Sequence, residues 1–195
     1  MKYEALEKIN QEMTASADAM QAADQKFLQE LQKNAESIRK TAIARPVILL
    51  AGPSGSGKTT TAFLLERFLD RWGVETHTIS MDNFFSTMTP QQREMAAAGK
   101  LDLESPARVD VPYLNQQLQS IIACEPTWMP RYHFPTTTRI DQDWQLTRKP
   151  GELLLLEGIH ALNPDVITIP EEMAGKSVWM KIRTQIEEWD DGKNP

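Results

Sequence analysis

Eight consecutive residues, Gly52–Thr59, have the types and the spacing of a loop that binds phosphate groups. Four residues separate Gly52 from Gly57, and Lys58 and Thr59 follow directly. Glycine lets the backbone bend around an anion so that several N–H groups point inward. Lys58 can reach the terminal phosphates of a nucleoside triphosphate, and the Thr59 hydroxyl can ligate Mg²⁺. We therefore expect ATP and Mg²⁺ as ligands, held by the following residues: Gly52, Ser54, Gly55, Ser56, Gly57, Lys58, Thr59 and Thr60.

The segments on either side of this loop support the same interpretation. Val47–Ala51 is apolar and predicts a buried strand, and Thr59–Trp72 predicts a helix. The positive N-terminus of such a helix would point at the bound anion. Because strand, loop and helix follow in this order, we interpret the loop as functional rather than as an ordinary glycine turn. GTPases, ATPases and small-molecule kinases share this loop, so it does not choose among them.

Two acidic residues follow predicted strands, where an open α/β sheet carries its functional groups. Asp82 follows the strand expected at Val74–Ser80, and Glu157 follows the apolar run Leu153–Leu156. Phosphoryl transfer needs positioning, neutralisation of charge and a group that accepts a proton. We therefore expect Lys58, Asp82 and Glu157 to be the catalytic groups.

Each acid also has a structural alternative. Asp82 could be a general base or could orient the substrate hydroxyl and the metal, but taken alone the pair Asp82–Asn83 favours a turn residue or a helix cap. A carboxylate such as Glu157 at the end of a buried strand is costly without a partner. Mg²⁺ or its water shell would be that partner, so we expect Thr59 and Glu157 to organise the metal. The alternative for Glu157 is a cap of the next turn.

The remaining pattern predicts the fold class. Further helices are expected at Pro90–Ala98 and Val111–Ala123, and further strands at Trp128–Phe134 and Val178–Ile182. Strands that alternate with helices imply an open, mostly parallel sheet flanked by helices. With the phosphate loop, this is the α/β P-loop NTPase fold.

Residues 1–44 differ from the rest because they contain neither glycine nor proline. Apolar residues recur there every seven positions at Leu6, Met13, Met20 and Phe27, and a second row is partly filled by Ala17, Leu31 and Ile38. This pattern predicts one long amphipathic helix, which precedes a domain at residues 45–195. The helix could fold back on that domain, or it could form a coiled-coil seam with a second copy of the chain.

Composition narrows the classes of partner and the location. The net charge of −6 gives no basic surface for nucleic acid. Cys124 is the only cysteine, so an internal disulfide is excluded and a cysteine metal cluster is not expected. The longest apolar runs, Val47–Ala51 and Leu153–Leu156, are too short to cross a bilayer, and the N-terminus carries no apolar signal core. We expect a cytoplasmic protein with a small-molecule substrate.

Several motifs in order resemble the uridine kinase and phosphoribulokinase family, most closely its bacterial uridine kinase-like branch. They are the phosphate loop, Ile79–Phe85, Leu103–Asp110, Pro130–Phe134 with Arg139, and Glu157–Leu162. The resemblance covers about residues 46–184. It implies that Asp82 takes the proton from a sugar 5′-hydroxyl and that Glu104 holds the ribose hydroxyls. It further implies that Tyr132 and Phe134 line a pocket for the base and that Arg139 contacts substrate or phosphate; by residue type alone, both aromatics could pack in an edge strand.

The sequence departs from this family at three places. His133 stands where uridine–cytidine kinases usually carry aspartate, and Thr137 stands where they carry a histidine that reads the base. After the last expected strand only the polar segment Gln185–Pro195 follows, so residues 45–195 are expected to lack the arginine-rich lid, or the chain is truncated before it.

The resemblance implies ATP-dependent phosphorylation of a small-molecule hydroxyl, with the 5′-hydroxyl of uridine or cytidine as the best match. The departures leave the acceptor open to ribulose phosphate, pantothenate or glycerate. A protein that binds nucleotide without catalysis is the alternative outside enzymes.

Overall fold

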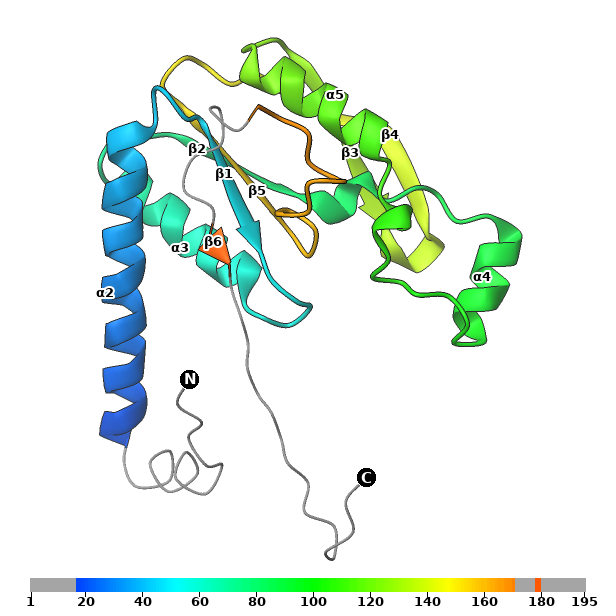
Figure 1. Cartoon of the computed structure of the whole chain (residues 1–195), viewed down its shortest axis with the longest axis horizontal. Coiled ribbons are helices and arrows are strands. Elements are labelled where there is room, and N and C mark those ends of the chain that lie inside the picture. Colours follow the sequence, from blue (N-terminus) through cyan, green and yellow to red (C-terminus); the bar gives the residue numbers. More distant parts are fainter. Residues whose placement is uncertain (1–16, 171–177, 180–195) are drawn as a thin grey trace, which may run out of the picture.

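A parallel sheet forms the centre of the molecule. The computed structural model describes residues 17–170 and 178–179 (Figure 1). Within them the sheet has the strand order β2-β5-β1-β6, and every pair of neighbours is parallel. The strands are β1 (Val47–Ala51), β2 (Thr76–Ser80), β5 (Leu153–Gly158) and β6 (Val178–Trp179). The rest of the strand expected at Val178–Ile182 lies outside the described residues.

Strands β1 and β5 are central because they are apolar on both faces. All five residues of β1 and all six of β5 are buried. Their side chains alternate between two cores, so Leu49 and Leu156 face one side while Ile48 and Leu155 face the other. An apolar run buried on both faces is typical of a central parallel strand.

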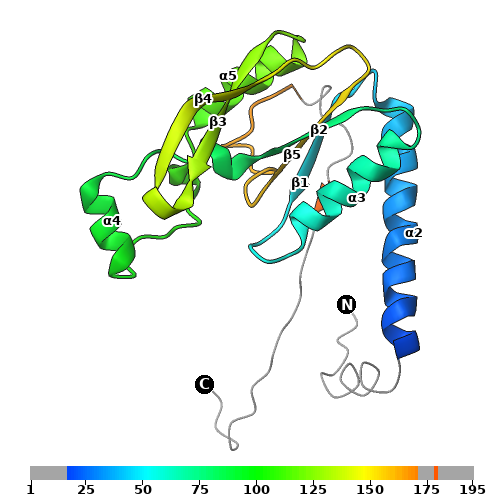
Figure 2. The ribbon, with the colours of Figure 1, turned by 180° about the vertical axis from the view of Figure 1, so that it is seen from behind.

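Helices cover both faces of the sheet. Helix α3 (Lys58–Asp70) packs on one face with α2 (Ala17–Thr41) beside it, as Figure 2 shows. Helix α5 (Val111–Ile122) covers the opposite face with Leu114, Leu118 and Ile121. The expected open parallel sheet, flanked by helices and preceded by a long N-terminal helix, is therefore confirmed.

Within residues 21–41, helix α2 packs on the domain through its C-terminal part. Leu31, Ala35, Ile38 and Ala42 are buried against α3 and the sheet. Residues 21–30 are all exposed, and Phe27 is 38% exposed. The second half of the helix therefore folds back on the domain. A coiled-coil seam between this helix and a second copy of the chain stays a prediction. Leu6 and Met13 lie outside the described residues.

A two-stranded antiparallel ribbon extends from the central sheet. It consists of β3 (Thr127–His133) and β4 (Thr138–Leu146). The sequence predicted β3 but not β4, because six successive residues of β4, from Ile140 to Gln145, are exposed and carry no continuous apolar signal. The ribbon positions two aromatic residues, Tyr132 on β3 and Phe134 directly after this strand.

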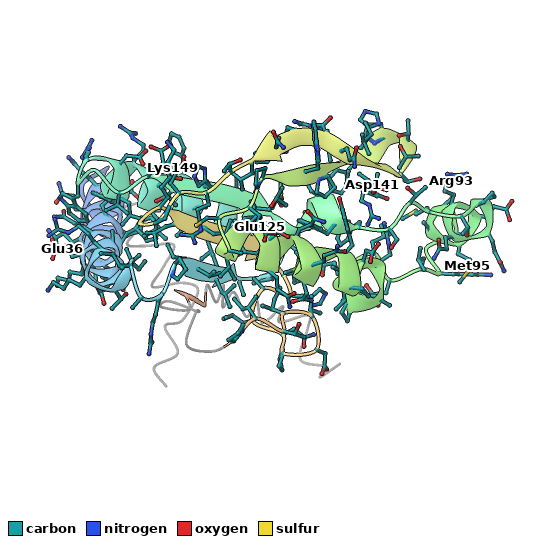
Figure 3. The ribbon with its side chains drawn as sticks, turned by 90° about the horizontal axis from the view of Figure 1, so that it is seen from above. Glu36, Arg93, Met95, Glu125, Asp141 and Lys149 are labelled. Carbon is teal, nitrogen blue, oxygen red and sulfur yellow. The ribbon has the colours of Figure 1, made fainter. Side chains whose placement is uncertain are left out.

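One short helix and three 3₁₀ turns complete the described fold. Helix α4 (Pro90–Ala97) lies at the end of the molecule opposite α2, and Figure 3 shows Arg93 and Met95 there and Glu36 at the other end. The 3₁₀ turns are η1 (Met81–Phe84), η2 (Pro106–Arg108) and η3 (Phe134–Thr136). In the described part of the chain, no helix has both the length and the apolarity needed to span a membrane.

Candidate active site

The loop between β1 and α3 has the backbone geometry of an anion site. Gly55 and Gly57 adopt left-handed conformations with φ of 72° and 81°, which residues with a Cβ rarely adopt. Gly57 is the N-cap of α3, and no side chain caps this helix or places an acid in its first turn. The N–H groups of the first turn are therefore available to an anion, which the helix dipole also attracts.

Two side chains of the loop fit a bound polyphosphate. The Ser56 hydroxyl oxygen is fully buried, and it is the only such side-chain polar atom in residues 21–170 without a hydrogen-bond partner. Leaving a buried polar group unpaired costs about 1–3 kcal/mol, which a ligand oxygen would relieve. Lys58 Nζ donates to the Pro53 carbonyl at 2.9 Å and so stays above the loop. The other predicted contacts in this stretch are Gly52, which is buried, and Ser54, Thr59 and Thr60, which are exposed.

Asp82 and Glu157 lie on neighbouring strands near this loop. Asp82 is in η1, directly after β2, and Glu157 is the penultimate residue of β5. The register pairs Ser80 of β2 with Glu157, which makes the two strand ends adjacent. Both carboxylates interact electrostatically with Lys58. Parallel pairing has thus brought together three charges that are far apart in the sequence.

Burial is the main influence on both acids. It raises the pKa of Asp82, which Lys58 and His160 lower and Glu104 raises further. Burial also raises the pKa of Glu157, whereas a hydrogen bond with the Ser80 side chain and the charge of Lys58 lower it and Asp82 raises it. The net shift of each pKa is upward. At both carboxylates the effect of burial on the pKa therefore outweighs the attraction of Lys58.

This environment fits a divalent cation. Mg²⁺ in phosphoryl-transfer sites is usually held by one or two carboxylates together with substrate phosphates. Glu157 and the Thr59 hydroxyl have the chemistry for this role, and bound Mg²⁺ would compensate the charge that burial disfavours. No cluster of three or more His, Cys, Asp or Glu suited to a metal occurs among the described residues.

A pocket of about 250 Å³ joins the phosphate loop to the predicted substrate residues. Its lining combines one cation, two acids, a hydroxyl and four apolar side chains: Ser54, Lys58, Asp82, Phe85, Leu103, Glu104, Phe134 and Ile159. Five of these, Ser54, Lys58, Asp82, Glu104 and Phe134, are residues that the sequence predicted for the site. Their individual roles stay predictions.

Two predicted substrate residues do not line this pocket. Tyr132 is only 5% exposed, and its hydroxyl accepts a hydrogen bond from Arg108. Its ring packs edge-on against the pocket residue Phe134, with the ring centroids 5.1 Å apart. Arg139 is bonded to Asp110 at 3.0 Å and to Asp141 at 2.6 Å. These contacts give Arg139 a structural role in the ribbon, and its contact with substrate remains a prediction.

Sequence reasoning did not single out three pocket residues, namely Phe85, Leu103 and Ile159. Each lies within three positions of a predicted site residue, so proximity to Asp82, Glu104 and Glu157 was the available signal. His160 is a further residue near the site that sequence analysis did not assign. The Nε2 of His160 lies 2.6 Å from the Glu104 carbonyl, which can only accept, so this nitrogen carries a proton. His160 thereby ties the Glu104 loop to the end of β5.

The spacing of the two acids depends on Gly158. A Cβ at this position would lie 2.6 Å from Met81 Cβ, which is too close for two carbon atoms. We expect Gly158→Ala to push η1 away from β5, to lower stability by about 1–3 kcal/mol and to lower kcat because Asp82 moves. Thermal unfolding would measure the loss of stability, and initial rates of phosphate transfer from ATP would measure kcat.

Gly73→Ala is the matched control for this prediction. Gly73 has φ of 73°, and no atom lies within 4 Å of the position that a Cβ would take there, so alanine is strained without crowding a neighbour. It should lower stability by about 1–2 kcal/mol and leave kcat unchanged. A normal kcat in Gly158→Ala would show that Gly158 does not control the position of Asp82.

The raised pKa of Glu157 predicts how stability depends on pH. Because the folded-state pKa lies above the unfolded value, the stability contributed by this group is complete below the unfolded pKa and is lost as pH rises through the folded pKa. Glu157→Gln removes this ionisation. Without ligands, we expect the variant to have a higher Tm than the original chain at pH 8, by about 2–4 °C for each kcal/mol relieved, and a smaller difference at acid pH.

Thermal scans between about pH 4 and pH 8, which bracket the ionisation of a carboxyl with a raised pKa, would test this expectation. Glu125→Gln changes an exposed glutamate after α5 and should leave Tm unaltered over the range. A lower Tm for Glu157→Gln at the alkaline end would mean that the ionised Glu157 is stabilised by its surroundings.

The parallel sheet flanked by helices, with a glycine-rich loop between β1 and α3, is the fold of P-loop proteins. The profile of the Phosphoribulokinase / Uridine kinase family matches residues 47–177, two thirds of the chain, and the chain belongs to this family. A uridine kinase of Lactobacillus helveticus is 31% identical over 131 residues, which cover 64% of this chain and 57% of that protein. A pantothenate kinase of Halalkalibacterium halodurans is 32% identical over 120 residues, which cover 60% of this chain and 36% of that protein.

Solved structures share the fold at lower identity. A structure described as a possible uridine kinase from Bacillus stearothermophilus has a TM-score of 0.55 at 21% identity, covering 77% of this chain and 80% of that one. The D-glycerate 3-kinase of Cryptococcus neoformans has a TM-score of 0.52 at 20% identity. The match covers 69% of this chain and 52% of that one. The match to the uridine kinase of Lactobacillus helveticus spans little more than half of that relative's length.

Proposed function

We propose that this chain transfers the γ-phosphate of ATP to the 5′-hydroxyl of uridine or cytidine. The observation that carries the proposal is the single pocket that Lys58, Asp82 and Glu104 share with aromatic side chains. Such a pocket offers a phosphate-binding cation, a proton acceptor and a hydroxyl-binding carboxylate around one volume. Family membership and the uridine kinases among the relatives support the same reaction.

Asp82 is assigned as the general base. Its carboxylate accepts the proton of the acceptor hydroxyl while the hydroxyl oxygen bonds to the γ-phosphorus and the bond from that phosphorus to the bridging oxygen of ADP breaks. The upward shift of its pKa, which burial causes, brings that pKa nearer to neutral pH and makes the carboxylate a better proton acceptor.

The phosphate loop binds and orients the donor. Lys58 and the N–H groups at the start of α3 hold the β- and γ-phosphates and stabilise charge that develops on them. When bound, Mg²⁺ supplies further neutralisation of this charge, and Thr59 and Glu157 are the residues that would hold it.

The lining of the pocket favours a neutral acceptor with several hydroxyls. Glu104 can accept hydrogen bonds from sugar hydroxyls, and Phe85 and Phe134 offer aromatic surfaces to a base. Among the described residues of the lining, Lys58 is the only cation, and it is assigned to the donor. A phosphorylated acceptor such as ribulose phosphate would therefore meet two acids without a free cation.

Carboxylate acceptors form the second candidate. A pantothenate kinase is among the relatives, and the fold is shared with a glycerate kinase. His133 and Thr137 replace the side chains that uridine–cytidine kinases use, which leaves room for a different acceptor.

A panel of acceptors tests the proposal. The chain is incubated with ATP, Mg²⁺ and, separately, uridine, cytidine, pantothenate, glycerate and ribulose 5-phosphate, and products are identified by mass spectrometry. We expect nucleoside 5′-monophosphate. Phosphorylation of pantothenate or glycerate alone would replace the acceptor, whereas ATP binding without any product would support a nucleotide-binding protein without catalysis.

A further inference from the structure

Residues 89–107 form an exposed segment beside the pocket, which we call the arm. Phe85 and Val109 flank it and form an isolated antiparallel bridge, so the base of the arm is closed. The arm contains α4 and no buried residue, and Figures 1 and 2 show α4 set apart from the central sheet. A segment without buried side chains opens at a low cost in free energy. The position of the arm therefore depends on the few polar contacts that hold it.

One hydrogen bond ties the arm to a distant part of the chain. The Nε2 of His160 donates to the Glu104 carbonyl, and the two atoms are 2.6 Å apart. Within residues 21–170, the other hydrogen bonds of the arm stay between positions 85 and 109, as does the one from Arg93 to the Met88 carbonyl. No salt bridge within these residues involves the arm. His160 is thus the polar attachment of the arm beyond its own base.

The donor of this hydrogen bond stands on a well-packed part of the fold. His160 lies two residues after the end of β5, and its own carbonyl accepts from the Asn163 N–H at 3.0 Å. The next residue, Ala161, is fully buried in the core beneath α5. The imidazole is therefore anchored by the core, whereas the carbonyl that it holds belongs to a segment without buried residues.

The held carbonyl belongs to a residue that lines the pocket. Leu103 and Glu104 are the two residues of the arm in the lining. The pKa of Asp82 is raised by the charge of Glu104 and lowered by that of His160, which shows that all three groups lie within electrostatic reach of one another. Release of the Glu104 backbone would therefore move a pocket carboxylate relative to Asp82.

We propose that His160 is a positioning residue, which holds the arm through the Glu104 carbonyl and so keeps the Glu104 carboxylate at the pocket for the acceptor. This inference rests on the proposed kinase function and adds to it a residue outside the pocket lining. His160 acts on the arm rather than on the phosphate loop. Loss of its hydrogen bond should therefore weaken binding of the acceptor and leave binding of ATP unchanged.

Two polar substitutions separate the hydrogen bond from other effects of the imidazole. In His160→Gln the amide nitrogen reaches about as far from the backbone as Nε2, whereas in His160→Asn it reaches only about as far as Nδ1. Both variants are neutral, so any change of charge near Asp82 is the same in both. His160→Asn should raise the KM of the acceptor by about 3- to 10-fold, with kcat and the KM for ATP changed less than about twofold. His160→Gln should keep the acceptor KM within about twofold of the original.

Trypsin reports the position of the arm without any acceptor. Lys100 is exposed in the arm, between α4 and the pocket residue Leu103. Cleavage after Lys100 in the full chain without ligands can be followed by mass spectrometry. It should be about 3- to 10-fold faster in His160→Asn, because cleavage follows the population of the open segment, and close to the original rate in His160→Gln.

His77→Asn is the matched control. His77 is on β2, outside the pocket lining, and its Nε2 lies 2.8 Å from Glu152 Oε2. The substitution removes a histidine hydrogen bond elsewhere in the fold. It should lower Tm without changing the rate of cleavage after Lys100 or the KM of the acceptor.

Each further outcome decides a part of the inference. Cleavage of His160→Asn at the original rate, or equal behaviour of the asparagine and glutamine variants, would overturn the role of the hydrogen bond. Faster cleavage with an unchanged acceptor KM would overturn the positioning of Glu104. If no compound of the acceptor panel gains a phosphate, the proposed function and the role of His160 in acceptor binding are both rejected, and cleavage after Lys100 alone decides whether His160 holds the arm.

Discussion

Asp82→Asn is expected to lower kcat by about 100- to 10,000-fold, because asparagine cannot accept the proton of the acceptor hydroxyl. The affinity for ATP should change little, since the donor is assigned to the loop Gly52–Thr59 and to α3. Steady-state rates with a saturating acceptor and the Kd of a fluorescent ATP analogue would separate the two effects. A loss confined to kcat is the signature of an interaction needed in the transition state.

The outer ribbon provides a control for this substitution. Asp143 is an exposed aspartate on β4 that pairs with Arg131, away from the pocket lining. Asp143→Asn makes the same chemical change and should leave both kcat and nucleotide affinity as they are. Turnover near the original rate in Asp82→Asn would reject Asp82 as the base and would favour its structural alternative as a turn residue.

Lys58→Met should lower kcat/KM for ATP by about 100- to 1,000-fold. Methionine keeps an unbranched side chain but removes the charge that is held above the loop by the Pro53 carbonyl. The variant should also lose part of its ATP affinity, because the phosphate-binding cation is absent in the ground state as well. Both quantities can be measured with the assays described for Asp82→Asn.

A second lysine distinguishes local from general electrostatic effects. The side chain of Lys149 is 79% exposed and lies outside the pocket lining. Lys149→Met changes the net charge by the same amount and should leave both the affinity for ATP and the kcat/KM for ATP unchanged. If both variants lost activity equally, the effect would not belong to the phosphate loop.

The local parts of the fold could be predicted because their signals are contiguous. Val47–Ala51 and Leu153–Leu156 are uninterrupted apolar runs, and each lies within a buried central strand. The glycines of the loop predict left-handed backbone, which Gly55 and Gly57 adopt. Parallel strands end at the same edge of a sheet. The positions of Asp82 and Glu157, each directly after a predicted strand, were therefore enough to predict that both lie at this edge.

The remaining features depend on contacts between distant segments. Strand β4 has six successive exposed residues, which mix polar with apolar side chains, and it is defined by its pairing with β3. The family resemblance implies that Arg139 contacts substrate or phosphate, whereas its salt bridges to Asp110 and Asp141 exist only in the folded chain. In the N-terminal helix, Leu31 and Ile38 of the second apolar row pack on the domain as the pattern predicts, whereas Phe27 of the seven-residue row is 38% exposed. The pairing of β4 and the salt bridges of Arg139 join segments that are distant in the sequence, so no pattern within a single segment contains them.

The most direct test of a phosphate loop that faces two strand-end acids is to follow the label of γ-³²P-ATP with uridine present and absent. Transfer predicts that the label appears in uridine 5′-monophosphate, that its appearance requires the nucleoside, and that release of inorganic phosphate is slow by comparison. Label found only in inorganic phosphate, at one rate with or without any acceptor of the panel, would contradict a kinase and indicate a hydrolase instead.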